Sequence, residues 1–450
     1  MERDQNRILV ESIKRLLRRR AYPNLKRIVK KTHAADLSII FRSLPLTDQR
    51  KLFNMIPDTA KKGILLSELD DDAYLQLASE MTADELAVIF ETMPSDDVAD
   101  LIDLLPEDTS NDVLKKMHKE GVAEVADLLS FADDTAGRIM TPDFIALRED
   151  VTAKEAISSL QKEYSDVEMP FYLYVVDDYG KLVGVSSLRQ LVVEPPDTPL
   201  KQFMVTHVFS VRTDMDQEEV AKLVARYDIL AVPVVDENNR LVGIVTVDDV
   251  IDIIRTEATE DILKMAGVGE EYVETKSVFK STRIRLPWLF ASCIGGIVAI
   301  VIIGHYVGVL SRVAYLAAFI PVISGMGGNI GTQSSTIVVR GLATGRLNVR
   351  DIWSVVVKEL CIGLILGMVY GLLIAAVAQV SYNTLMLAIS VGLALMSSMA
   401  IAALVGSFVP MVMARLNIDP AVATGPFVTT SIDIISVSFY FILATTLLGL

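Results

Sequence analysis

Hydrophobic positions follow two different patterns along the 450-residue chain. In the last third they form five almost continuous apolar blocks, at about 286–310, 313–339, 352–380, 384–414 and 420–448. About 20 apolar residues in a helix are enough to cross a hydrocarbon core of ~30 Å. Because a buried helix of a soluble protein is rarely this long, the five successive blocks predict a five-helix transmembrane domain over residues 283–450.

Basic residues flank these blocks unevenly, and this asymmetry predicts the orientation of the domain in the membrane. They precede the first block and lie in every second loop: Lys276, Lys280, Arg283 and Arg285, then Arg340, Arg346 and Arg350, then Arg415. The other two loops hold only His305 with Arg312, and an uncharged stretch at 379–383. Since basic loops remain on the cytoplasmic side, we expect a multi-pass protein of the inner (plasma) membrane, with a cytoplasmic N-terminal body and the C-terminus outside. The N-terminus lacks the apolar core of a signal peptide.

The first two thirds of the chain show shorter hydrophobic repeats that suit a folded soluble body. Between residues 24 and 132 the apolar positions have helical spacing, and proline followed by acidic residues recurs in "SLPLTD" (43–48), "MIPD" (55–58), "TMPSDD" (92–97) and "LLPEDT" (104–109). Proline and acidic side chains are both favoured at the start of a helix. These signals predict a stack of short helices, an α-solenoid-like N domain, after a basic segment at 1–23.

A sequence repeat lies between residues 138 and 255. The stretch "VVDDYGKLVG" (175–184) matches "VVDENNRLVG" (234–243) at a constant offset of 59 residues. Two units of short strands and helices, at 138–199 and 200–255, are therefore expected to pack as a pseudo-symmetric α+β pair. Both units resemble CBS domains, which occur as tandem pairs.

The two CBS-like units differ at the positions that concern nucleotides. The second unit carries Gly243, Thr246 and Asp249 of the family pattern, whereas the first has Gln190 where an acid would bind a ribose. Arg189 leaves an anion site open in the first unit, with Tyr172 as a second nucleotide contact. The residues leave undecided whether ATP binds at the CBS pair.

Charge is distributed in blocks along the chain. Residues 283–450 hold four acidic and eight basic residues (Lys or Arg), and residues 1–31 hold three acidic and eleven basic residues. Residues 32–282 hold 50 acidic and 23 basic residues, which gives this part a net charge of −27. An acidic body argues against nucleic acid as a partner and suits a divalent metal. The basic N-terminus suits either anionic lipid or a solvated helix face. Cys293 and Cys361 form no disulfide framework or CxxC site, and no nucleophile–base set indicates an enzyme.

A helix from about 247 to 272, in a connecting segment at 247–276, carries many of the acids. Glu257, Glu260 and Asp261 are spaced i, i+3, i+4 and share a face, where like charges destabilise a helix by about 0.2–0.5 kcal/mol per pair. One interpretation is a solvated acidic face. The other is a cation site, because oxygen ligands without His or Cys suit Mg²⁺ or Ca²⁺. The further acids of this hypothesis are Asp96, Asp100, Asp216, Glu218 and Asp228.

The second apolar block contains more glycine and polar residues than a plain membrane anchor needs. The stretch "PVISGMGGNIGTQ" (321–333) includes Gly325, Gly328, Asn329, Thr332 and Gln333. Its glycines suit close helix packing. They also suit a helix that opens, so that carbonyl and amide oxygens line a water-filled path. The polar neighbours favour the second interpretation.

In the fifth block Asp433 is surrounded by apolar residues. A charge at mid-span costs ~2.5–3.5 kcal/mol on insertion scales, and the spans offer only Lys358, near a span end, as a basic partner. A position facing a hydrated pore therefore explains Asp433 better than a structural ion pair. Thr429 and Gly425 share its helix face, and Asp419 would lie at the cytoplasmic mouth.

Taken together, these features resemble the MgtE family of magnesium channels and transporters over essentially the whole chain. The most specific parts are "GGNIGTQ" (327–333), "EATEDI" (257–262) and "DPA" (419–421) with Asp433. The resemblance implies a homodimer with one cation pore between subunits, lined by the second and fifth spans, with the connecting helix as a plug. It also implies that Asp433 holds Mg²⁺ through its water shell and that Mg²⁺ enters the cell down its electrochemical gradient. It further implies that Asp249 and Asp252 join the acidic set, and that cytoplasmic Mg²⁺ bound to this set closes the pore.

Other functions fit parts of the same pattern. The chain could be a nucleotide-gated secondary transporter of another divalent cation such as Co²⁺, although the mid-span regions lack a basic or His residue for proton coupling. It could instead be a membrane receptor, in which case Asp433 should tolerate apolar replacement. The residues leave open the choice among Mg²⁺, Co²⁺, Mn²⁺ and Ca²⁺, and between a channel and a carrier.

Overall fold

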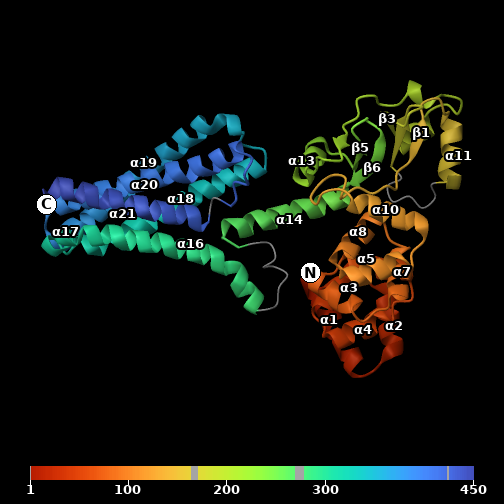
Figure 1. Cartoon of the computed structure of the whole chain (residues 1–450), viewed down its shortest axis with the longest axis horizontal. Coiled ribbons are helices and arrows are strands. Elements are labelled where there is room, and N and C mark those ends of the chain that lie inside the picture. Colours follow the sequence, from red (N-terminus) through yellow and green to blue (C-terminus); the bar gives the residue numbers. More distant parts are fainter. Residues whose placement is uncertain (1, 164–170, 269–277, 423–424, 450) are drawn as a thin grey trace. The chain divides into compact units, whose positions relative to one another are not determined.

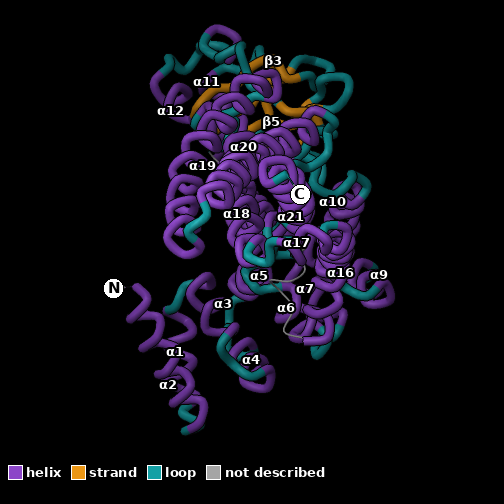
Figure 2. Tube along the Cα trace, turned by 90° about the vertical axis from the view of Figure 1, so that its left-hand side faces the viewer, coloured by secondary structure: helices purple, strands orange, loops and turns teal. Residues whose placement is uncertain are grey.

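The computed structural model describes residues 2–163, 171–268, 278–422 and 425–449 (Figure 1). These residues form two compact units, Met1–Arg255 and Thr256–Leu450, called below the N-terminal unit and the membrane unit. The strands occur in one part of the chain and helices build the rest (Figure 2). The N-terminal unit contains a helical domain and two small sheets, and the membrane unit is helical.

The N-terminal unit begins with a stack of short helices. They are α1 (Glu2–Arg18), α2 (Tyr22–Lys31), α3 (Ala34–Arg42), α4 (Leu46–Phe53), α5 (Thr59–Ser67), α6 (Asp71–Ala78), α7 (Ala83–Phe90), α8 (Ser95–Leu104), α9 (Glu107–Leu114) and α10 (Lys119–Leu129). Pro45, Pro94 and Pro106 occupy the N-caps of α4, α8 and α9, and each of these helices has an acid in its first turn. The sequence signals for these helix starts are therefore confirmed.

A continuous apolar core holds the stack together. The core includes Phe41, Phe53 and Phe90, all buried. Tyr74 of α6 is buried as well, and its hydroxyl donates a hydrogen bond of 2.9 Å to the Leu101 carbonyl of α8. The basic N-terminal segment is part of this fold, because α1 buries Ile13 in the same core.

Two three-stranded sheets follow, and they have the same order and register. The first contains β1 (Ala146–Arg148), β2 (Tyr172–Val176) and β3 (Leu182–Ser187), and the second β4 (Val211–Arg212), β5 (Ala231–Val235) and β6 (Leu241–Thr246). Both antiparallel pairs have a register shift at the equivalent step, between Val175 and Val176 and between Val234 and Val235. The repeat in the sequence is therefore a structural repeat. Helices α11 (Ala153–Glu163), α12 (Leu188–Val193) and α13 (Gln217–Tyr227) and the 3₁₀ turn Leu200–Gln202 complete it.

A reciprocal contact joins the two repeats. A Cβ at Gly184 would lie 2.5 Å from Sδ of Met204, and a Cβ at Gly243 would lie 2.6 Å from Sδ of Met140. Each glycine thus makes room for a methionine from the other repeat. The exchange explains why both repeats keep glycine at this strand position, and it packs the two halves as one pair.

Helix α14 (Val247–Met265) follows β6 directly. The prediction of a helix to about residue 272 is wrong, because Gly267 has a φ of +70°. The N–H groups of Gly267 and Val268 bond back to the carbonyls of Lys264 and Leu263, both at 2.9 Å. This is a glycine C-cap, which ends a helix by satisfying its last carbonyls. The rest of the predicted segment, with Glu270 and Glu271, lies outside the described residues.

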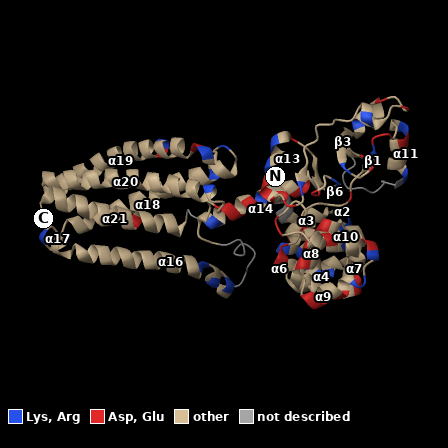
Figure 3. Ribbon diagram, turned by 45° about the horizontal axis from the view of Figure 1, so that its top comes forward, with Lys and Arg blue, Asp and Glu red and all other residues tan. Residues whose placement is uncertain are grey.

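The membrane unit consists of long apolar helices joined by short connections. They are α16 (Val278–His305), α17 (Val307–Arg312), α18 (Leu316–Ala343), α19 (Ile352–Tyr382), α20 (Leu385–Arg415) and α21 (Pro426–Leu448), with a 3₁₀ turn at Val349–Asp351. By length and composition, five of the described helices can cross a membrane, which agrees with the five predicted spans. Their lengths are largely uncharged, and Lys and Arg gather toward their ends (Figure 3).

Glycines set the closest helix contacts in this unit. On α19, a Cβ at Gly363, Gly367 or Gly371 would lie 2.6–3.0 Å from an atom of α20, with backbone oxygens of Met399, Met396 and Gly392 among those nearest. These glycines are spaced four residues apart, so they form one stripe on the helix. Without side chains along this stripe, the two backbones approach closely, as small residues allow in membrane helices.

Candidate functional site

Helix α18 presents a polar stripe on a face that the single chain leaves uncovered. Gly325, Asn329, Thr332 and Gln333 are all exposed, at helical spacing. A Cβ at Gly325 or Gly328 would meet nothing within 4 Å. The predicted polar residues therefore share an open face of the second span.

The other glycines of α18 serve packing. A Cβ at Gly327 would lie 2.9 Å from Oγ of Ser436 and 3.0 Å from Oγ of Ser398, and Gly331 contacts the side chain of Ile432. The expectation that this helix opens is wrong, because α18 is unbroken from Leu316 to Ala343. An unbroken helix keeps its backbone groups paired within the apolar region, so side chains, rather than exposed carbonyls, form the polar stripe. The packing interpretation of the glycines is therefore confirmed at Gly327 and Gly331, and the polar residues lie on another face of the unbroken helix.

Asp433 lies on α21 and is half-buried. The hydroxyl of Ser324 on α18 donates a hydrogen bond to its Oδ1. Thr429 and Gly425, one and two turns earlier, are also partly exposed, as their shared face requires. Asp433 is thus fixed to the helix that carries the polar stripe, and the described structure pairs it with no basic side chain.

The end of α14 lies against the segment that begins α21. Lys264 forms ion pairs with Glu260 on its own helix and with Asp419, the latter at 2.8 Å. A Cβ at Gly425 would lie 2.9 Å from the Met265 carbonyl oxygen. The predicted mouth residues Asp419 and Gly425 are therefore in contact with the predicted plug helix, and Lys264 is a partner that sequence reasoning missed.

In the N-terminal unit, carboxylates of α8 face the first turn of α14. Burial, followed by the charge of Asp249, raises the pKa of Asp97 from 3.8 to about 7. Burial raises the pKa of Asp249 to about 6, against the hydrogen bond that it accepts from Thr246. Burial also raises the pKa of Asp100, against the lowering effect of the Arg138 charge. The predicted residues Asp100 and Asp249 thus belong to one like-charged group, to which the structure adds Asp97.

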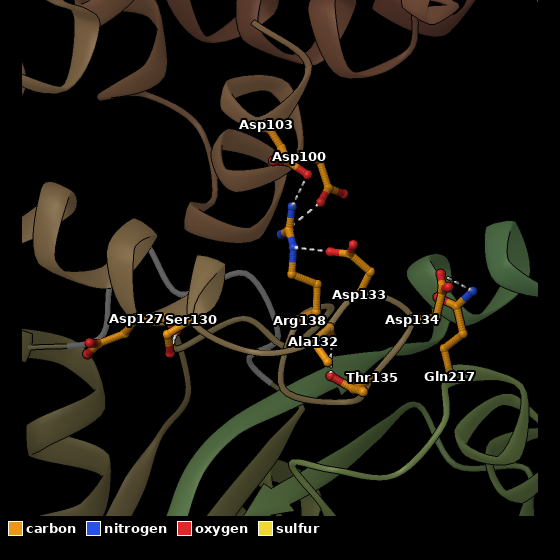
Figure 4. A network of polar contacts seen from close by, with 10 residues as sticks. All are labelled: Asp100, Asp103, Asp127, Ser130, Ala132, Asp133, Asp134, Thr135, Arg138 and Gln217. Carbon is orange, nitrogen blue, oxygen red and sulfur yellow. Dashed lines mark hydrogen bonds and ion pairs between the residues drawn. The ribbon is translucent and has the colours of Figure 1, made fainter. Parts of the chain in front are cut away.

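A buried arginine connects this group to the start of the first CBS-like unit. The Arg138 side chain is 7% exposed, and its guanidinium lies 2.9 Å from Asp100, 3.6 Å from Asp103 and 3.9 Å from Asp133 (Figure 4). One positive charge is thus shared by three carboxylates. The sequence offered a signal for Arg138, a lone base in the acidic stretch 132–143, but it did not reveal the partners.

The other predicted acids lie on α8, α13 and α14. Asp216 is the N-cap of α13 and Asp228 its C-cap, so they lie at opposite ends of a helix about 16 Å long. Glu218 pairs with Lys222 and Asp252 with Arg255. Asp96 on α8, and Glu257 and Asp261 on α14, are partly buried. Among the described residues, no three Asp, Glu, His or Cys side chains converge as a metal site.

The expected nucleotide positions have local roles in capping helices. Ser187 and Gln190 form a reciprocal capping box at the start of α12, which explains an amide where the family pattern has an acid. At the equivalent place in the second repeat, Thr246 donates a hydrogen bond of 2.5 Å to Asp249. Arg189 is exposed and Tyr172 is partly exposed, so both can reach a ligand from solvent.

Family models match this architecture in chain order. The model of the MgtE intracellular N domain matches residues 32–134, the CBS domain model matches 136–197 and 200–256, and the MgtE model, described as a divalent cation transporter, matches 320–443. The magnesium transporter MgtE of Thermus thermophilus is 42% identical over 329 residues, which are 72% of this chain and 73% of that protein. The chain belongs to the MgtE family.

Two further comparisons support the MgtE assignment of each part. The magnesium transporter MgtE of Enterococcus faecalis is 40% identical over 326 residues, 72% of each protein. The crystal structure of the cytosolic domain of the Mg²⁺ channel MgtE in complex with ATP covers 54% of this chain and 99% of that chain, with 35% identity and a TM-score of 0.52. The helical domain and CBS pair are thus the MgtE cytosolic architecture.

Proposed function

We propose that the chain moves Mg²⁺ across the inner (plasma) membrane into the cell, along a path lined by α18 and α21. The observation that carries the proposal is the open polar stripe of α18, hydrogen-bonded through Ser324 to Asp433 in an otherwise apolar span. Two relatives at 42% and 40% identity, both named magnesium transporter, support the choice of ion.

The side chains of the path suit a hydrated divalent ion. Mg²⁺ gives up its water reluctantly and usually keeps several water ligands. One carboxylate with amide and hydroxyl groups, from Asn329, Gln333 and Thr332, can hold the water shell without replacing it. Weak holding of this kind lets an ion enter and also leave. The membrane potential supplies ~2.3 kcal/mol per charge for each 100 mV, which favours inward movement of a divalent cation.

The proposed path needs a second copy of the chain. A single Asp433 balances only half the charge of Mg²⁺, and the polar stripe is open in one chain. A two-fold symmetric dimer would place two copies of Asp433 and two polar stripes around one axis. We therefore propose a homodimer with one path between the subunits.

The same proposal includes closure by cytoplasmic Mg²⁺. The acids of α8 and of the first turn of α14 repel one another when no cation is bound, since the charges of Asp249, Asp100 and Asp248 add to burial in raising the pKa of Asp97. Mg²⁺ bound between them would favour the arrangement in which α14 stays against Asp419 and Gly425. Nucleotide bound at the CBS pair would act on the same gate, since a relative's cytosolic domain was solved with ATP; Arg189 would hold its phosphates.

The test is ion flux into proteoliposomes that contain a trapped Mg²⁺ indicator. Asp433→Asn keeps an acceptor for Ser324 but removes the charge, and we expect Mg²⁺ influx to fall at least about tenfold while the dimer stays intact on size-exclusion chromatography. Ser438→Ala is the matched control, because within the described part of the chain that hydroxyl bonds only to the Ile434 carbonyl of its own helix. Influx of wild-type rate through Asp433→Asn would refute the path. Equal influx of Co²⁺ and Mg²⁺ would favour transport of a broader set of cations.

A further inference from the structure

The membrane unit contains a second buried carboxyl that the proposed path does not use. Glu359 of α19 is only 4% exposed, and the hydroxyl of Ser334 on α18 donates a hydrogen bond of 2.8 Å to its Oε2. The structure assigns Glu359 no ion pair among the described residues, and the neighbouring Lys358 is exposed. A carboxyl inside a membrane domain is unfavourable unless it is bonded, so the Ser334 contact is its main compensation.

Glu359 continues the glycine stripe by which α19 packs on α20. Residues 359, 363, 367 and 371 are spaced four apart, and the last three are the glycines that contact α20. Glu359 therefore lies at one end of the contact between α19 and α20, and from there its side chain bonds to Ser334 of α18. The Glu359 side chain thus connects α18 with α19, two helices that otherwise pack mainly against α20.

Helix α18 is thus held by a carboxyl at two points. Asp433 of α21 accepts from Ser324, and Glu359 of α19 accepts from Ser334. The two serines are ten residues apart, about 15 Å along the helix, and the polar stripe of Gly325, Asn329, Thr332 and Gln333 lies between them. Each bond comes from a different neighbouring helix.

Two hydrogen bonds add directional contacts to the apolar packing of α18, whose Ile323 and Ile330 are buried in the core of the membrane unit. Gly327 and Gly331 lie at its contacts with α20 and α21, and they contribute no side chains that interlock with those helices. Turning the helix by one residue position is a rotation of 100°, which would move Asn329 away from the open face. Hydrogen bonds at the two ends of the stripe oppose such a turn.

We propose that Glu359 is a positioning residue for ion permeation, which acts through Ser334 to hold the polar stripe of α18 toward the path. The inference rests on the proposed path along α18. It assigns a functional role to a carboxyl that contacts neither the open face nor Asp433.

The test uses the full-length protein in proteoliposomes and compares Glu359→Gln, Glu359→Leu and Ser334→Ala. Gln keeps an oxygen that accepts from Ser334, so we expect Mg²⁺ influx within about twofold of wild type. Leu, of similar size, and Ser334→Ala break the bond, and we expect about tenfold slower influx with a reduced preference for Mg²⁺ over Ca²⁺. Ser335→Ala is the matched control, because that buried hydroxyl has no hydrogen-bond partner in the described structure.

A double variant separates positioning from stability. Glu359→Leu and Ser334→Ala each leave a buried polar group unpaired, whereas the two changes together remove both partners, which is often nearly neutral for stability. We expect the melting temperature of the double variant to recover while the Mg²⁺ over Ca²⁺ preference stays low. Recovery of both, or wild-type selectivity in Glu359→Leu, would overturn the inference. Asp433→Asn, measured alongside, shows whether the path itself is correct.

Discussion

Replacing Asp97 by Asn should stabilise the N-terminal unit at neutral pH when no divalent cation is present. Asp97 lies on α8, and burial raises its pKa from 3.8 to about 7, with further contributions from Asp249, Asp100, Asp248 and Glu68. At pH 7.5 its carboxylate is therefore charged in an environment that disfavours charge. Asparagine has nearly the same shape without the charge, so it relieves this repulsion.

The sign of the pH dependence follows from the direction of the shift. A pKa that is higher in the folded state means that the folded protein binds the proton more tightly than the unfolded chain does. The resulting stabilisation is complete below about pH 4, near the ordinary Asp value, and is lost as the pH rises through about 7. A shift of this size corresponds to at most ~4 kcal/mol, and because Asp97 is partly solvent-accessible we expect ~1–2 kcal/mol.

The assay is urea unfolding of a fragment of residues 1–268 in chelator at pH 5.5 and pH 8. The fragment is justified by the separately solved cytosolic domain of a relative. Wild type should be less stable at pH 8 than at pH 5.5, and Asp97→Asn should reduce that difference. Mg²⁺ at pH 8 should stabilise wild type more than the variant. Asp127→Asn, an exposed acid on α10, is the control. A less stable Asp97→Asn at pH 8, with an unchanged pH profile, would refute the reasoning.

Three further variants test other contacts. Lys264→Met removes the ion pair with Asp419. An ion pair of this exposure contributes ~0.2–1 kcal/mol, so Mg²⁺ flux at high cytoplasmic Mg²⁺ should rise by up to about fivefold. An unchanged response of the flux to cytoplasmic Mg²⁺ would contradict the proposed gate. Arg138→Met should lower the free energy of unfolding of the same fragment in chelator by ~1–3 kcal/mol and increase the stabilisation of the fragment by Mg²⁺. Equal unfolding curves for this variant and wild type would contradict the sharing of the Arg138 charge by three carboxylates. Gly367→Val places a Cβ 2.7 Å from the Met396 carbonyl oxygen and should cost ~1–3 kcal/mol in detergent, whereas Gly304→Val, with open space, should leave the melting temperature unchanged.

The elements that depend on local signals were predictable from the sequence. Five spans follow from length and hydropathy, and the two sheets follow from matching residues at an offset of 59. Even the early end of α14 had a signal, because Gly267 is a typical C-cap residue. The expected opening of α18 was wrong, although glycine is unfavourable in helices on scales measured in water. In an apolar surrounding, the need to pair each backbone group outweighs that penalty.

The partners within the site were not predictable in the same way. Helical spacing placed Asn329, Thr332 and Gln333 on one face, because spacing is local. Ser324 and Asp433 are 109 positions apart and Ser334 and Glu359 are 25 apart, and one sequence does not show which distant side chains meet. For Asp97, burial between α8 and α14 decides its behaviour, and burial depends on tertiary packing rather than on the acidic run itself.

In the proposed homodimer, the open face of α18 would link assembly to permeation. Lipid tails cannot hydrogen-bond the amides of Asn329 and Gln333, so this face is unfavourable against lipid and needs either water or a protein partner. In the proposed homodimer, a second copy related by two-fold symmetry would supply the same face, and two such faces would enclose a polar space rather than a dry contact. The residues that make one chain unsuited to lipid are therefore the residues that would hold a hydrated ion. Replacing Asn329 by Leu should then lower Mg²⁺ influx and at the same time make the isolated chain more compatible with lipid. An influx unaffected by this change would show that the path lies elsewhere.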